Sequence, residues 1–138
     1  MSVLAIFEEL EQASGKNAKV EILRNNKDND AFVQLLDAAL NFKRKFYIKK
    51  FKVEPLSNDP SERAGDWFKE LLVQLQTREV TGNAAISLVE GFFSECSPLE
   101  AKWYSRILVK DLRCDFGISS CHKAGIMIPE FEVMLAKD

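Results

Sequence analysis

The sequence has little of what most catalytic and metal sites need. It contains one histidine, His122, and three cysteines, Cys96, Cys114 and Cys121. No C-x-x-C pair is present and His122 directly follows Cys121, so we do not expect a metal site. One histidine next to one cysteine is also weak evidence for a catalytic nucleophile with its general base. We read the cysteines as reduced, buried hydrophobes.

Long apolar runs and phosphate-binding glycine loops are missing as well. No window approaches eighteen consecutive apolar residues, which argues against a membrane span. The N-terminus, "MSVLAIFEELEQ", turns acidic at once and lacks the basic region of a signal peptide, so we expect a cytoplasmic protein. Neither G-x-x-x-x-G-K-[ST] nor G-x-G-x-x-G occurs. Nothing in the sequence indicates an enzyme acting on its own.

What is present is typical of a helical globular domain. The 138 residues are 46% hydrophobic and 29% charged, enough for one compact domain with a core. Apolar residues recur at helical spacing, without an alternating strand run. We predict an all-α single domain of about seven to eight helices. The main segments are 4–10, 16–26, 30–42, 60–76, 84–93, 98–114 and a short helix after Gly117.

Three helix starts carry a capping signal. Asp30 is a good N-cap for the third segment. Asp59 and Pro60, with Glu62 three residues after the cap, open the next, and the stretch "SPLE" at 97–100 repeats the pattern. These signals predict where the helices begin.

Positive charge is concentrated although the net charge is −2. Residues 43–52, "KRKFYIKKFK", carry six cations and no acid, and their aromatic residues are expected to be partly buried. In the helix beginning at Pro98, four cations share one stripe: Lys102, Arg106, Lys110 and Arg113. Like charges at this spacing cost a few tenths of a kcal/mol per pair. The stripe fits either a polyanion partner or a solvated basic face.

The stretch "TREVTGNAAISL" raises a related question. Gly82 ends or restarts a helix there, and the amides of Asn83, Ala84 and Ala85 would be first-turn donors. A helix start with small side chains lets a phosphate approach free N–H groups. Residues 117–120, "GISS", form a second start of the same kind. Each is also readable as an ordinary cap.

These residues resemble a known family. "TREVTGNAAI" is similar to the Thr-Gly-Asn-Ala-Ala segment of ATP-dependent DNA ligases, especially those of T-even-type tailed phages. "RILVKDLR" looks like the Arg-Ile-x-x-Lys-Asp-Leu-Lys/Arg helix of the same domain, and "ILRNNKDND" and "YIKKF" look like matching phage segments. The resemblance runs from about residue 3 to 136. Asp115 departs from it, standing where relatives usually have glycine.

The resemblance implies a domain and a set of DNA contacts. Residues 1–136 would be the all-helical N-terminal DNA-binding domain, and 137–138 the start of a linker to an absent nucleotidyltransferase domain. Such a domain grips nicked duplex DNA across the minor groove without reading bases. The residues that it implies as contacts are Gly82, Asn83, Ala84, Arg106, Lys110, Arg113, Gly117, Ser119 and Ser120, with Lys49 and Lys50 from "YIKK".

The resemblance also implies what this chain lacks. Family ligases carry a Lys-x-Asp-Gly motif whose lysine is adenylylated, and this sequence has none. The chain alone would be inactive and need no cofactor, whereas the full ligase would use ATP and Mg²⁺ to seal nicks in replication, repair and recombination. Its partners would be nicked duplex DNA and the nucleotidyltransferase and OB domains of the same chain. It is expected to be a monomer. The alternative is a helical protein-interaction module using Trp67, Phe68 or Trp103.

Overall fold

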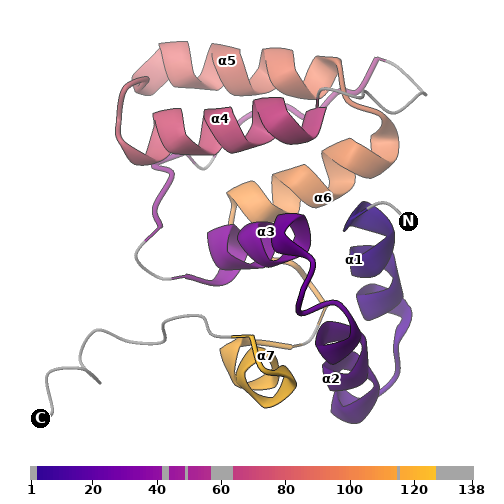
Figure 1. Ribbon diagram of the computed structural model, residues 1–138. Helices are drawn as coiled ribbons and strands as arrows, with labels where there is room; N and C mark the ends of the chain where they lie inside the picture. The colour runs from indigo at the N-terminus through magenta and orange to yellow at the C-terminus, as the bar shows by residue number, and fades with distance from the viewer. Residues whose placement is uncertain (1–2, 42–43, 49, 57–63, 115, 127–138) are drawn as a thin grey trace, which may run out of the picture. The chain divides into compact units, whose positions relative to one another are not determined.

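The computed structural model describes residues 3–41, 44–48, 50–56, 64–114 and 116–126. Within these ranges the chain forms seven helices and no strand (Figure 1). They are α1 (Val3–Gln12), α2 (Lys16–Asn25), α3 (Asp30–Leu40), α4 (Ala64–Gln76), α5 (Gly82–Ser94), α6 (Pro98–Leu108) and α7 (Ile118–Ala124). The prediction of an all-α chain with seven to eight helices is therefore confirmed.

Two compact units make up the chain. One combines Met1–Lys43 with Leu112–Asp138, and the other is the continuous stretch Arg44–Asp111. We call them the discontinuous unit and the continuous unit. The predicted domain bounds, 1–136 and 137–138, stay a prediction. None of the described helices combines the length and apolar character needed to cross a bilayer.

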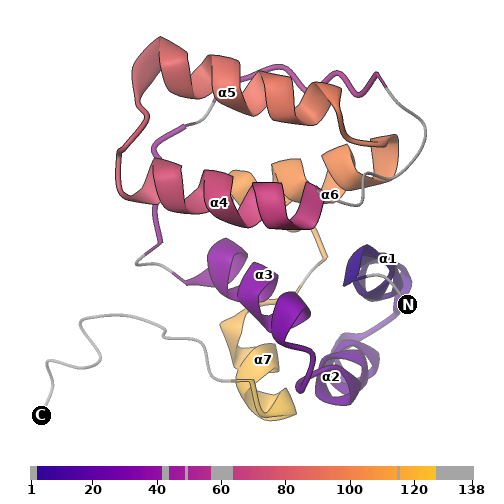
Figure 2. The same cartoon turned by 45° about the horizontal axis from the view of Figure 1, so that its top comes forward.

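The discontinuous unit packs α7 against α2 (Figures 1 and 2). Its core includes Phe7 of α1 and Phe32 of α3, whose ring centroids lie 5.1 Å apart. The Arg24 guanidinium donates from α2 to the carbonyl of Lys123 on α7 at 3.3 Å. Asn29, not Asp30, caps α3, because its side chain accepts a hydrogen bond from the Phe32 amide at 3.2 Å. The predicted start is thus one residue late.

The continuous unit is built on aromatic packing. Helices α4 and α5 lie side by side, joined by residues 77–81, and α6 also contacts α4 (Figure 2). Phe68 of α4 stacks on Tyr104 of α6 with centroids 4.4 Å apart, and on Phe92 of α5 at 5.5 Å. Such ring pairs add about 0.5–1.5 kcal/mol beyond the area that they bury.

The predicted start of α6 is confirmed in detail. The Ser97 hydroxyl accepts from the Glu100 amide at 3.2 Å, while the Glu100 carboxylate accepts from the Ser97 amide at 2.9 Å. Pro98 occupies the first turn, where no amide hydrogen is required. The other predicted start, Asp59 to Glu62, lies outside the described residues.

An extended segment precedes α4 and is held along α5. The Lys52 amide donates to the Glu90 carboxylate at 2.9 Å, and the Leu56 amide donates to the Ser94 carbonyl at 3.1 Å. Phe51 stacks on Phe93 with centroids 5.6 Å apart. This places the described part of the basic run on the continuous unit.

Candidate nucleic-acid interface

The N-terminal end of α5 is open to solvent. Thr81, Gly82, Asn83 and Ala84 are all exposed, and the Thr81 side chain makes no capping hydrogen bond. The first amide of this region with a partner inside the helix is that of Ala85, which donates to the Thr81 carbonyl at 3.3 Å. The amides of residues 82–84 precede that bond, as first-turn donors do. Small side chains leave an anion free to approach them.

Gly82 is needed here for its backbone conformation. Its φ is +61°, a left-handed value that costs residues with a Cβ about 1–2 kcal/mol. A Cβ at this position would meet no atom within 4 Å, so space alone does not require glycine. A substitution of Gly82 would therefore disturb the turn and the anion approach together.

Helix α6 presents two of the four predicted stripe cations. Lys102 and Arg106 both lie against the buried Trp103 ring, with Nζ 5.0 Å and Cζ 4.8 Å from its centroid. The helix ends at Leu108, so Lys110 and Arg113 are not on it. The prediction of one helix from Pro98 to Cys114, bearing a stripe of four cations, is wrong.

A reversal of the backbone at Lys110 ends the helix. Lys110 has φ +63°, its amide donates to the Ile107 carbonyl at 3.0 Å, and the Asp111 amide donates to the Arg106 carbonyl at 2.9 Å. This pair of bonds is the Schellman motif, which usually places glycine at the left-handed position. Lys110 Nζ lies 5.5 Å from the centroid of the Phe46 ring.

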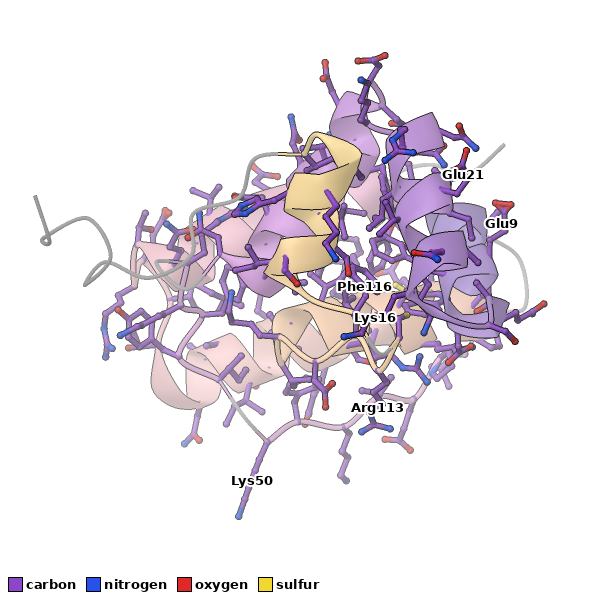
Figure 3. The ribbon with its side chains drawn as sticks, turned by 90° about the horizontal axis from the view of Figure 1, so that it is seen from below. Glu9, Lys16, Glu21, Lys50, Arg113 and Phe116 are labelled. Atoms are coloured by element: carbon purple, nitrogen blue, oxygen red, sulfur yellow. The ribbon has the colours of Figure 1, made fainter. Side chains whose placement is uncertain are left out.

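Arg113 belongs to the discontinuous unit, with φ +58° and an exposed side chain that points outward (Figure 3). The second glycine-led start is nearby in sequence. Gly117 precedes α7, and Ser119 is exposed. Ser120 is buried, and its amide donates to the Gly117 carbonyl at 3.1 Å. The two serines therefore differ in access, while Asp115 lies outside the described residues.

The basic run contributes a feature that sequence reasoning missed. Lys50 extends away from the ribbon (Figure 3), whereas Lys49 lies outside the described residues. Phe46 and Ile48 are buried as expected, but Tyr47 between them is 58% exposed. The Arg78 guanidinium covers its ring at 4.5 Å. The sequence carried no signal for this exposure, because Phe46, Tyr47 and Ile48 are three consecutive aromatic or aliphatic residues.

The aromatic residues of the alternative protein-interaction module are too little exposed to form a binding surface. Phe68 and Trp103 have no exposed area, and Trp67 is half-buried with its ring 5.0 Å from that of Phe92. These aromatic residues form core contacts. An interaction module using them would have to unpack the continuous unit.

Two of the cysteines, Cys96 and Cys121, are unsuited to nucleophilic chemistry. Burial raises the pKa of the Cys121 thiol from 9.0 to about 12. Burial, followed by the nearby Glu100 and Glu95 carboxylates, raises the pKa of Cys96 to about 12 as well. A neutral thiol is a poor nucleophile and a poor metal ligand. No group of three or more potential metal-binding side chains occurs among the described residues.

Comparison with known proteins places these features in a family context. The sequence model described as DNA ligase N terminus matches residues 38–124. The DNA ligases of Enterobacteria phages T4 and T6 are each 28% identical over 140 residues, covering 97% of this chain. The chain spans only 28% of the length of these relatives.

Solved structures share the fold. The structure named Pmar-Lig_PreS3 superposes with a TM-score of 0.81 and 24% sequence identity, covering 94% of this chain and 32% of its own. The structure named Pmar-Lig_Pre. gives a TM-score of 0.78 at 24% identity, over 94% and 31% of the two chains.

Proposed function

This chain belongs to the DNA ligase N-terminus family, and from that premise we propose that it binds nicked duplex DNA through the sugar-phosphate backbone. It serves as the DNA-binding domain of an ATP-dependent DNA ligase. Contacts to the backbone fix the position of a protein on a duplex and carry no sequence information themselves. Binding is accordingly independent of base sequence and spans the minor groove on either side of the nick.

The observation that carries the proposal is the open start of α5. Residues 82–84 combine exposed, small side chains with first-turn amides, and Gly82 holds the left-handed turn that leads into them. A phosphate at this place accepts hydrogen bonds from backbone groups and meets the positive end of the helix dipole. The amides of Asn83 and Ala84 form the phosphate clamp.

Each unit carries further candidate phosphate contacts of its own. Arg106, Lys110 and Lys50 come from the continuous unit, and Arg113 comes from the discontinuous unit together with Gly117 and Ser119. Ser120 is left out because its hydroxyl is buried and its amide is already bonded. Lys49 remains a prediction. Neutralising several phosphates releases counterions, so affinity falls steeply as salt rises.

The chemistry of ligation is proposed to lie in the remainder of a longer protein. The relatives are DNA ligases more than three times as long, and this sequence has no Lys-x-Asp-Gly. The parent enzyme would use ATP and Mg²⁺, while this chain holds the substrate for it. Incubating the chain with radiolabelled ATP should give no covalent adenylate.

Replacing Asn83 with proline tests the clamp, because proline removes one backbone donor. Proline is tolerated in the first turn of a helix, where the missing amide has no partner in the helix. The matched control is Asn83→Ala, which removes the same side chain and keeps the amide. We expect Asn83→Pro to bind a fluorescent nicked duplex about tenfold more weakly than Asn83→Ala at equal salt.

Circular dichroism melting of both variants separates lost binding from lost folding. Equal duplex affinities for the two variants, with both folded, would contradict the backbone clamp. A Lys110→Glu/Arg113→Glu double variant tests the cations in the same assay. Unchanged affinity and an unchanged dependence on salt would rule out their contact with DNA.

A further inference from the structure

A cavity of about 340 Å³ opens on the continuous unit, beside the basic run and Lys110. Residues 45–48 of the basic run form one side of it, and residues 108–110 at the end of α6 form the other. Its volume lies within the range of small-ligand pockets, toward the lower end. It can hold one large side chain.

The interior of the cavity is apolar. Phe46, Ile48 and Leu108 are buried around it, and Val109 adds an aliphatic surface that is 44% exposed. A large aliphatic side chain exposed at the wall of a cavity gains free energy when an apolar group covers it. The occupant therefore carries an apolar side chain.

Two residues in the left-handed conformation shape the walls of the cavity. Tyr47 has φ +57° on one side and Lys110 has φ +63° on the other. The Schellman bonds of Lys110 and Asp111 fix the second wall, and Arg44 Nε fixes the approach to the first by donating to Gln76 Oε1 at 2.8 Å. Backbone bonds thus define the end of α6 that forms one side of the cavity.

The rim is positively charged. Lys45 is exposed on it, and Arg44 and Lys110 both lie against the Phe46 ring, 5.6 Å and 5.5 Å from its centroid. Arg78 lies against the neighbouring Tyr47 ring. The lining stretches contain no acid, and the nearest acid along the chain is Asp111. Cations held around an apolar cavity complement carboxylates placed next to an apolar side chain.

We infer that this cavity, which we call the 46/109 pocket, docks an acidic peptide segment of a partner protein that inserts one large apolar side chain. The apolar side chain fills the space between Phe46 and Val109. The carboxylates beside it meet Lys45, Lys110 and the flanking arginines. The inference shares Lys110 with the proposed DNA contacts but does not require that the chain binds DNA.

A peptide suits the pocket better than duplex DNA does. The surface of a duplex consists of phosphates, sugars and the edges of stacked bases, none of which projects an apolar group into a cavity of this size. Charge alone would suit both ligands, so the apolar interior decides between them.

Fluorescence anisotropy with a labelled peptide tests the inference on the whole chain. The probe is a short peptide, amidated at its C-terminus, in which three aspartates directly precede one phenylalanine. Two control peptides replace the aspartates with asparagines or the phenylalanine with alanine. We expect the probe to bind, and each control peptide to bind at least about tenfold more weakly.

Val109→Glu places a carboxylate in the pocket, and Val73→Glu is its matched control on an exposed position of α4. We expect Val109→Glu to weaken probe binding at least about tenfold and Val73→Glu to leave it unchanged. Lys45→Glu, at an exposed position, gives the same loss and serves if Val109→Glu fails to fold. The inference is overturned if the unaltered chain does not bind the probe, or if Val109→Glu and Val73→Glu behave alike.

A nicked duplex measured with the same variants separates this inference from the proposed function. If the probe does not bind and Val109→Glu lowers duplex affinity, the pocket belongs to the DNA interface and the inference fails. If the probe binds the pocket while the unaltered chain shows no duplex binding at low salt, the inference stands and the proposed function fails.

Discussion

Single residues in the left-handed conformation explain how two cations reach the surface of the continuous unit. Arg78 at the end of α4 and Lys110 at the end of α6 have φ values of +61° and +63°. In both cases the amide of the next residue donates to a carbonyl five residues back, at 2.9 Å. Glycine is the usual residue at this position. Both cations therefore lie at positions where the backbone is strained.

Lys110→Gly should raise the stability of the fold relative to Lys110→Ala, while both variants weaken DNA binding. Glycine relieves the left-handed strain. Alanine also removes the lysine side chain but keeps a Cβ, so we expect Lys110→Gly to be about 1 kcal/mol more stable than Lys110→Ala. Urea unfolding at neutral pH measures the difference. Both variants lose the cation and are expected to bind nicked duplex more weakly. Equal stability of the two variants would mean that Lys110 is not strained.

Cys96 should make the free energy of unfolding depend on pH in the alkaline range. Its pKa is 9.0 in an unfolded chain and about 12 in the fold, so the folded state holds the thiol proton longer. The stability that this provides is fully present below pH 9 and is lost as pH rises toward about 12. Urea unfolding of the unaltered chain and Cys96→Ala gives the test. The gap between them should narrow above pH 9, and a constant gap would contradict the shift.

At the scale of helices, starts and ends were predicted with different success. The start of α6 is marked locally, because Ser97, Pro98 and Glu100 act within one turn. Its end is not marked: Ile107, Leu108, Leu112 and Cys114 are all buried and fit a continued helix as well as a break. The left-handed Lys110 follows from tertiary packing and backbone bonds. Two of the four stripe cations were misplaced for that reason.

The same distinction holds for the candidate site. The glycine-led start of α5 was predictable, since Gly82 and the small residues after it are visible in the sequence. The 46/109 pocket was not, because its two sides lie about sixty residues apart along the chain. Exposure of Tyr47 likewise depends on which face of an extended segment packs on its neighbours.

The capping box of α6 should account for a measurable part of the stability of the continuous unit. Ser97→Ala removes the acceptor of the buried Glu100 amide, and loss of such a cap costs about 1 kcal/mol. Ser87→Ala, on the exposed face of α5, is the control and should change stability by less than about 0.5 kcal/mol. Denaturant midpoints of the two variants make the comparison. Equal midpoints would show that the cap is redundant.

At the scale of the whole molecule, the two units differ in how the chain closes them. The continuous unit uses one uninterrupted stretch, and the bond from Lys52 to Glu90 within it spans 38 residues. The discontinuous unit needs both ends of the described chain, as the bond from Arg24 to Lys123 spans 99 residues. This difference has a consequence for the order of folding.

During synthesis, α1 to α3 leave the ribosome long before the helix on which α2 packs. Closing a longer loop costs more entropy, and a contact cannot form until both partners exist. The continuous unit should therefore fold first, and the N-terminal helices should become native only after α7 has been synthesised. A truncated chain that ends beyond Asp111 but before α7, released from the ribosome, is expected to show protease protection in residues 64–108 and cleavage within 3–40. Equal protection of both stretches would contradict this order. The N-terminal helices of such a chain are its last part to become native, although they are the first part made.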